Sequence, residues 1–202
     1  MHRTCKSLWI CVVFIFALSV AARGQGIVDR SGEVAGTVGF SNATGVSSDK
    51  HFAFGGSGAF NVIKTVAAGF EYSYTPLGLE PLYTGLASSE HLQLYGGFVR
   101  LSPLKTKRAV PYAVVGMGGA NLYAEATAMG LSLGVSRSGL NVSVGGGASI
   151  YAGAHWGVRP EFRFMHQQFG STAVDGTPIP SFGQNNYVAT VSVFCQFGGI
   201  KK

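Results

Sequence analysis

Residues 155–167 read HWGVRPEFRFMHQ, and this stretch decides the fold because apolar and polar side chains alternate along it. In an extended chain, one face carries Trp156, Val158, Pro160, Phe162 and Phe164. The opposite face carries His155, Gly157, Arg159, Glu161, Arg163 and Gln167. A period of two predicts a β-strand with one apolar face and one polar face.

The same alternation recurs along the chain and gives eight candidate strands. They are 33–41, 51–62, 66–75, 90–101, 110–122, 140–151, 155–167 and 187–197. Each is near the roughly ten residues that a tilted membrane strand needs. The segment 110–122 is apolar on both faces, so its register is not predicted. No apolar run after residue 25 is long enough for a transmembrane helix.

The connections between these segments alternate in length. Short ones fall at 63–65, 102–109 and 152–154, and longer ones at 42–50, 76–89, 124–139 and 168–186. Outer-membrane barrels combine short periplasmic turns with long external loops. The pattern therefore predicts an all-β fold, an eight-stranded antiparallel up-and-down transmembrane β-barrel, whose apolar faces meet lipid. The alternative is a soluble protein whose polar strand faces are exposed to solvent.

The N-terminus has the three parts of a secretory signal: basic Arg3 and Lys6, an apolar run from Leu8 to Val20, and small residues before Gln25. We expect residues 1–24 to be a signal peptide and 25–202 to be one barrel domain. Removal of the signal peptide also removes Cys5 and Cys11, so Cys195 has no disulfide partner within the mature chain.

The charge balance argues against nucleic-acid binding. The full chain has a net charge of +6, and loss of Arg3, Lys6 and Arg23 leaves 12 basic residues against 9 acidic ones, or +3. Only 12% of the residues are charged, about half the fraction in average soluble proteins. This low charge without a long apolar segment is typical of a membrane β-barrel.

Several charged residues fall on faces predicted to point into the barrel. An eight-stranded barrel is just wide enough for its side chains to fill, and an isolated charge inside would be costly. We therefore expect an interior charge network that braces and plugs the barrel. Its predicted members are Glu33, Glu71, Arg159, Glu161 and Arg163.

The mature chain resembles the small OmpA-like and OmpX-like outer-membrane β-barrels over nearly its full length. The stretch Gly157-Val158-Arg159-Pro160-Glu161-Phe162-Arg163-Phe164, the segment 95–100 (YGGFVR) and a final amphipathic strand with Phe197 near its end carry this likeness. The resemblance implies localisation in the outer membrane of a Gram-negative-type bacterium, contact with its lipids and insertion by the barrel-insertion machinery. Family barrels usually end on an aromatic residue, whereas here residues 198–202 follow Phe197.

Enzyme chemistry finds little support in the sequence. Related lipid A deacylases share a His-x-Ser pair, and no histidine of the mature chain is followed by serine at that spacing. A catalytic triad of His91, Glu90 and either Ser88 or Ser89 can be proposed, although any serine-rich loop provides a similar set of residues. His51 and His91 are predicted to face inward without metal-ligand spacing. Gly145 to Gly147 is expected inside a strand. We expect no catalytic residues, metal or cofactor.

Basic residues gather at the predicted periplasmic end: Arg30, Lys64, Arg100, Lys105, Lys107, Arg108, Lys201 and Lys202. A rim of Lys64, Lys105, Lys107 and Arg108 is expected to contact anionic lipid headgroups, with ordinary solvated turns as the alternative. The function expected is a structural, envelope-integrity or surface-interaction role, with a monomer meeting partners through its outer loops. A lipid-modifying enzyme and a narrow ion channel stay open as alternatives.

Overall fold

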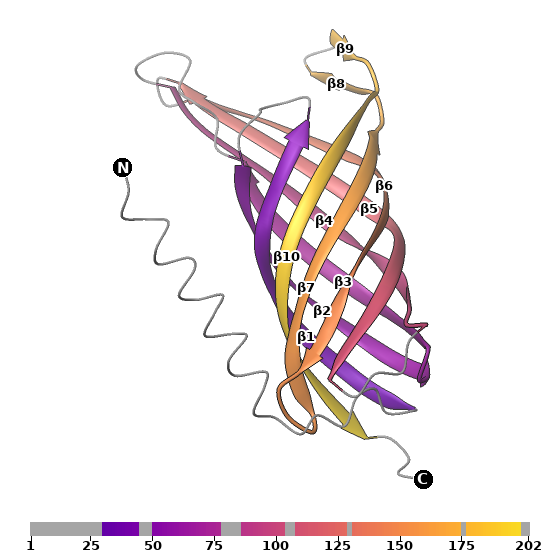
Figure 1. Ribbon diagram of the computed structural model, residues 1–202. Helices are drawn as coiled ribbons and strands as arrows, with labels where there is room; N and C mark the ends of the chain where they lie inside the picture. The colour runs from indigo at the N-terminus through magenta and orange to yellow at the C-terminus, as the bar shows by residue number, and fades with distance from the viewer. Residues whose placement is uncertain are drawn as a thin grey trace.

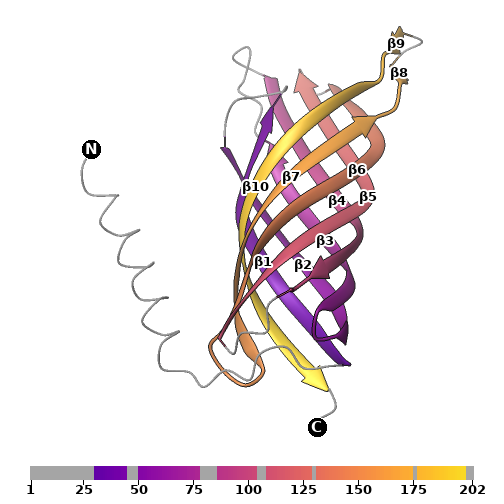
Figure 2. The ribbon, with the colours of Figure 1, turned by 45° about the vertical axis from the view of Figure 1, so that its right-hand side comes forward.

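The computed structural model describes residues 30–44, 50–77, 86–103, 108–128, 131–174 and 177–198. Eight long strands close into one barrel (Figures 1 and 2). They are β1 (Ser31–Thr44), β2 (Lys50–Ile63), β3 (Val66–Leu77), β4 (Leu86–Leu101), β5 (Ala109–Ala128), β6 (Leu131–Tyr151), β7 (Trp156–Phe169) and β10 (Phe182–Gly198). The short strands β8 (Thr172–Val174) and β9 (Thr177–Ile179) form a separate hairpin. The expected signal peptide, residues 1–24, lies outside the described residues.

All neighbouring strands of the barrel run antiparallel, and β1 closes against β10 with Ser31 opposite Gly198. Following paired residues once around the barrel from Ser31 returns to β1 at Ser41, ten residues farther along. This stagger requires tilted strands. The predicted eight-stranded antiparallel up-and-down barrel is confirmed. We call the end where β1 begins and β10 ends the terminal end, and the opposite end the far end.

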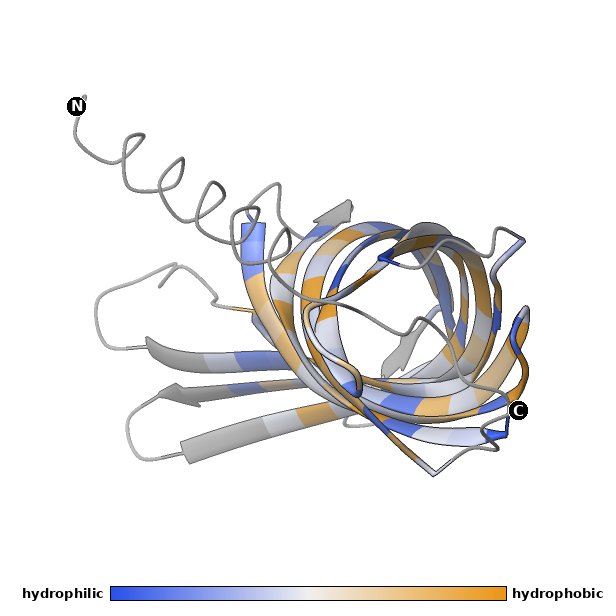
Figure 3. Ribbon diagram, turned by 60° about the horizontal axis from the view of Figure 1, so that its bottom comes forward, coloured by the Kyte–Doolittle hydropathy of each residue, from blue (hydrophilic) through white to orange (hydrophobic). Residues whose placement is uncertain are grey.

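The outward face of the barrel is apolar, as the alternation predicted. Figure 3 shows apolar and polar residues alternating along the strands. Large outward side chains are about half exposed, for example Phe52 at 48%, Phe162 at 55% and Val193 at 59%. The structure also sets the register of β5, with Val114 buried and Met117 outward. Within the described residues, no helix is long and apolar enough to cross a membrane.

One predicted loop, 124–139, is wrong. β5 continues to Ala128 and β6 begins at Leu131, so the two strands pair far beyond the expected ends. Small and polar residues dominate this stretch, and a sheet that leaves the membrane has no lipid-facing apolar row to mark it as a strand. Strand β4 is likewise longer than expected, starting at Leu86 rather than residue 90.

Glycines let neighbouring strands approach closely in the barrel wall. The triple glycine 145–147 lies within β6, as the sequence predicted. A side chain on Gly145 or Gly147 would collide with backbone oxygens of Phe162 or Pro160 on β7. These glycines therefore serve strand packing and curvature rather than phosphate binding.

Candidate functional site: the barrel interior and the far end

A buried charge cluster fills the barrel near its terminal end. Glu33 of β1 accepts contacts from Arg159 of β7 at 2.8 Å and from Arg100 of β4 at 3.1 Å. Arg159 also donates to Ser149, and its guanidinium lies 4.5 Å from the ring centroid of Phe194. Each charged group thus has an opposite charge or an aromatic ring beside it, which offsets the cost of burial.

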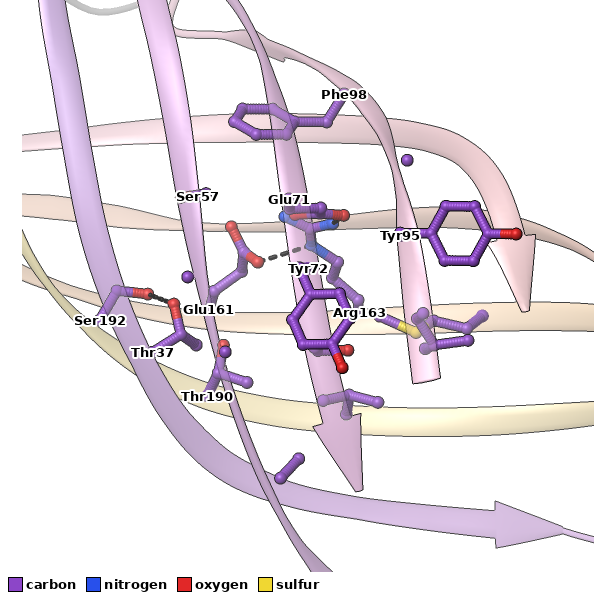
Figure 4. A pocket seen from close by; sticks show the side chains of 18 of the residues that line it. Thr37, Ser57, Glu71, Tyr72, Tyr95, Phe98, Glu161, Arg163, Thr190 and Ser192 are labelled. Atoms are coloured by element: carbon purple, nitrogen blue, oxygen red, sulfur yellow. Dashed lines mark hydrogen bonds and ion pairs between the residues drawn. The ribbon is translucent and has the colours of Figure 1, made fainter. Parts of the chain in front are cut away.

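A second charge cluster lies farther along the interior (Figure 4). Arg163 of β7 contacts Glu71 of β3 and Glu161 on its own strand, each at 2.5 Å. The hydroxyl of Tyr112 on β5 donates to Glu161 at 2.6 Å. The structure therefore brings all five predicted interior residues into two clusters, in which three carboxylates face three guanidinium groups once Arg100 is included.

Arg100 is the member that the sequence reasoning missed, because it was grouped with the basic residues at the periplasmic end. It is only 5% exposed and points inward. The signal was present in the alternation of β4, where Tyr95, Val99 and Leu101 form the outward face. The residues between them, including Arg100, must then face the interior.

A small cavity with polar and apolar walls adjoins the second cluster. Its volume is about 80 Å³, and its walls include Thr37, Ser57, Thr190 and Asn141. Thr37 and Ser192 share a hydrogen bond of 2.8 Å across β1 and β10 (Figure 4). Since one water needs roughly 10–15 Å³ of such space, the cavity has room for a few waters and none for a sizeable solute.

Toward the far end the interior holds an apolar cluster beside buried polar side chains such as Gln167 and Asn186. Buried side chains from β3, β4, β5, β7 and β10 pack into one cluster, and Phe182 packs against it. The cluster consists of Leu77, Leu92, Leu94, Ala120, Leu122, Met165, Phe169 and Val188. We call it the apolar plug. The sequence analysis did not predict it, because it treated inward positions as polar; a filled barrel packs its interior like any protein core.

The histidines do not form an active site within the described residues. His51 faces inward, as expected, on the same face as buried Ala53. The prediction that His91 faces inward is wrong: it lies on the outward face, stacked between Tyr74 and Tyr123. Glu90 points inward and is buried, so successive residues of the proposed triad lie on opposite faces of β4. No cluster of metal-ligating side chains occurs among these residues.

With this geometry established, the family can be assigned. A family model described as an outer membrane protein β-barrel domain matches residues 9–197. The chain belongs to this outer-membrane β-barrel family. A comparison with curated protein sequences gave no match.

Solved structures of outer-membrane barrels share the family fold. Neisserial surface protein A aligns with a TM-score of 0.56 at 12% identity, covering 83% of this chain and 96% of that one. The attachment invasion locus protein Ail of Yersinia pestis aligns with a TM-score of 0.52 at 10% identity, covering 83% and 98%. At such identities the likeness concerns the fold alone. The protein resides in the outer membrane of a Gram-negative-type bacterium.

Family membership indicates the surroundings of the barrel's outward face and of its two ends. The outward apolar residues contact lipid, and the short turns of outer-membrane barrels lie on the periplasmic side. Residues 64–65 connect β2 and β3 at the terminal end, so we expect that end to face the periplasm and the far end to face the exterior. Arg30, Lys64 and Arg108 are exposed at the terminal end. The other predicted rim residues, Lys105 and Lys107, lie outside the described residues.

At the far end, β4, β5 and β6 pair with one another beyond the last residues that pair with β3 and β7. β4 pairs with β3 only up to Glu90, and β6 pairs with β7 only up to Gly139. Among the described residues, the extension thus leaves 86–89 of β4 and 131–137 of β6 as edges without a neighbouring barrel strand. Near the base of the extension, the carbonyl oxygen of Ser138 accepts a hydrogen bond from the backbone N–H of Gly170. The guanidinium carbon of Arg137 lies 5.2 Å from the ring centroid of Phe182.

Proposed function

We propose that this barrel is a non-conducting membrane anchor that holds the extended β4–β6 sheet outside the cell as a surface for protein partners. The observation that carries the proposal is the pair of strand edges, 131–137 of β6 and 86–89 of β4, that no described barrel strand covers. Uncovered edges present backbone donors and acceptors that can pair with an added strand. A partner with an extended segment fits this surface.

The contacts in the barrel interior support the proposed role as a rigid membrane anchor. We infer that Glu33, Glu71, Arg159, Glu161 and Arg163 act with Arg100 as struts, since their contacts join β1, β3, β4 and β7 across the lumen. Cross-lumen contacts resist distortion of the barrel. A rigid barrel holds the extended sheet in a fixed orientation, which lowers the entropic cost of binding a partner.

The ion-channel alternative is disfavoured by two features. The apolar plug lies in the interior at the outer side of the cavity, and the lining charges are engaged in ion pairs. An apolar constriction opposes ion passage by excluding water. Planar-bilayer recordings of the purified protein should therefore show no unitary current steps, and reproducible steps would favour the channel.

The enzyme alternative lacks an assembled nucleophile. Among the described residues, His166 contacts Asn185 and His91 contacts two tyrosine rings, so neither activates a serine. Mass spectrometry of envelope lipids from a deletion strain tests this alternative directly. A lipid species that changes on deletion and returns with the wild-type gene would favour the enzyme.

The periplasmic rim is a separate proposal. Lys64, Lys105, Lys107 and Arg108 would attract anionic headgroups of the inner leaflet, each contact contributing on the order of 1 kcal/mol. The exposure of Lys64, which follows the exposed Ile63, and of Arg108 supports this role. Replacement of the four residues by glutamine should lower association with anionic vesicles relative to neutral ones. An unchanged ratio would assign them to solvated turns.

The partner proposal is tested by trimming the extended sheet. Glu125 and Gly134 are paired residues on β5 and β6, so replacing residues 126–133 by an Asn-Gly turn shortens both strands in register. We expect cells carrying this variant to lose adhesion to surfaces coated with extracellular host proteins, while the barrel stays folded. A matched control inserts the same turn in place of residues 175–176, in the β8–β9 hairpin. Equal adhesion of trimmed and wild-type cells would contradict the proposal.

A further inference from the structure

A row of aromatic rings crosses the outward face of β1 to β5. It consists of Phe40, Phe52, Phe54, Tyr74, His91 and Tyr123. Successive ring centroids lie between 4.8 and 6.2 Å apart. The three phenylalanines stand at the β1–β2 end, and the polar rings stand at the β4–β5 end. The polarity of the row therefore rises toward the extended sheet.

The polar end of the ring row lies where the barrel leaves the hydrocarbon. On β4, the outward positions from the terminal end read Leu101, Val99, Gly97, Tyr95, then Gln93, His91 and Ser89. On β5, the outward face likewise changes from Val115 and Met117 to Tyr123 and Glu125. A change from aliphatic through aromatic to polar side chains marks the membrane interface. The polar rings therefore lie at the level of lipid headgroups.

Among the described residues, the polar atoms at this end have no hydrogen-bond partner. His91 stacks on Tyr74 and Tyr123 with interplanar angles of 25° and 17°, so the ring faces are covered and the edges stay free. Within the described part of the chain, these three rings make stacking contacts only, and the amide of neighbouring Gln93 is likewise without a hydrogen bond. His166, on the other side of the barrel, differs because its Nδ1 lies 2.7 Å from Asn185 Oδ1.

The free groups include both donors and acceptors. The imidazole, the two phenols and the amide of Gln93 can each donate and accept, and the exposed carboxylate of Glu125 can only accept. A phosphate offers acceptors alone, and it would be repelled by Glu125. A sugar offers hydroxyl groups that donate and accept, so it satisfies the whole set.

We propose that this end of the ring row binds the sugar hydroxyls of a glycolipid in the outer leaflet. The binding residues are Tyr74, His91, Gln93, Tyr123 and Glu125. The stacked rings hold the hydrogen-bonding edges in place before the lipid arrives, so little side-chain entropy is lost on binding. The barrel thus orders one lipid headgroup at the foot of its extended sheet.

Native mass spectrometry of the purified full barrel tests this site. The protein is incubated in mild detergent with equal amounts of galactosyl diacylglycerol, phosphatidylglycerol and phosphatidylcholine, and the lipid that stays bound is identified. Wild type should retain the galactolipid in preference. His91→Phe and Tyr123→Phe keep the rings but remove hydrogen-bonding groups, and each should lower that preference about two- to tenfold.

His166→Phe is the matched control and should leave the preference unchanged, because His166 lies outside the ring row. Circular dichroism checks that each variant is folded. The two ring variants are independent, so if one misfolds, the other still tests the proposal. Equal retention of the three lipids, a preference for phosphatidylglycerol, or an equal effect of the His166 substitution would each overturn the proposal.

Discussion

Arg100 Nη2 on β4 lies 3.1 Å from Glu33 Oε1 on β1, and two other strands separate these elements around the barrel wall. The contact therefore spans the lumen rather than linking neighbours. Glu33 also binds Arg159 at 2.8 Å, so one carboxylate neutralises two guanidinium groups. Loss of the Glu33 carboxylate therefore removes two ion pairs, whereas loss of the Arg100 guanidinium removes one.

Glu33→Gln should destabilise the barrel more than Arg100→Met. The first change leaves two buried guanidinium groups without a carboxylate, whereas the second leaves Glu33 paired with Arg159. Removing one partner of a buried ion pair costs about 3–5 kcal/mol. Urea unfolding in lipid vesicles measures the difference, with exposed Glu125→Gln as the control. Equal stability of the two variants would mean that Glu33 does not connect both arginines.

The second cluster predicts coupling between Arg163 and Glu71. Arg163→Met removes the partner of two carboxylates, while Glu71→Gln leaves Arg163 bound to Glu161. We expect the arginine substitution to lower the free energy of unfolding more, and the double variant to cost less than the two single losses together. A double-mutant cycle in urea measures this coupling, with Arg137→Met as an arginine control outside both clusters. Strict additivity would show that the two residues act independently.

Gly119 and Tyr95 give a test of the outward face. A Cβ on Gly119 would lie 2.5–2.7 Å from atoms of the Tyr95 ring, whereas a Cβ on Gly36 would meet nothing within 4 Å. Both glycines are on the outward face. Gly119→Ala should therefore destabilise the barrel by about 1 kcal/mol through displaced packing, and Gly36→Ala should be neutral. In a Tyr95→Ala background the penalty at Gly119 should vanish, and its persistence would point to backbone strain instead.

Alternation predicted the barrel and most strand faces because lipid imposes an apolar row on every membrane strand. The same rule failed where the strands leave the hydrocarbon. His91 was predicted to face inward, yet it lies on the outward face among the polar rings at the membrane interface. The stretch 124–139 looked like a loop for the same reason, since the extended sheet carries no lipid-facing row.

The interior was only partly predictable from sequence. Glu33, Glu71, Arg159, Glu161 and Arg163 could be placed inside because a charge cannot face hydrocarbon. Their pairing depends on the stagger of the strands, which brings Glu33 opposite Arg100 from three strands away. The apolar plug gave no signal, because an inward leucine such as Leu92 or Leu94 has the same sequence pattern as one facing lipid.

The position of the extended β4–β6 sheet outside the cell is tested most directly by cysteine labelling of intact cells. In a Cys195→Ala background, Ser136→Cys places a thiol on the extension of β6, and Lys64→Cys places one at the terminal end. A membrane-impermeant maleimide should label position 136 in intact cells and position 64 only after the envelope is opened. Labelling of position 64 but not 136 in intact cells would contradict the account.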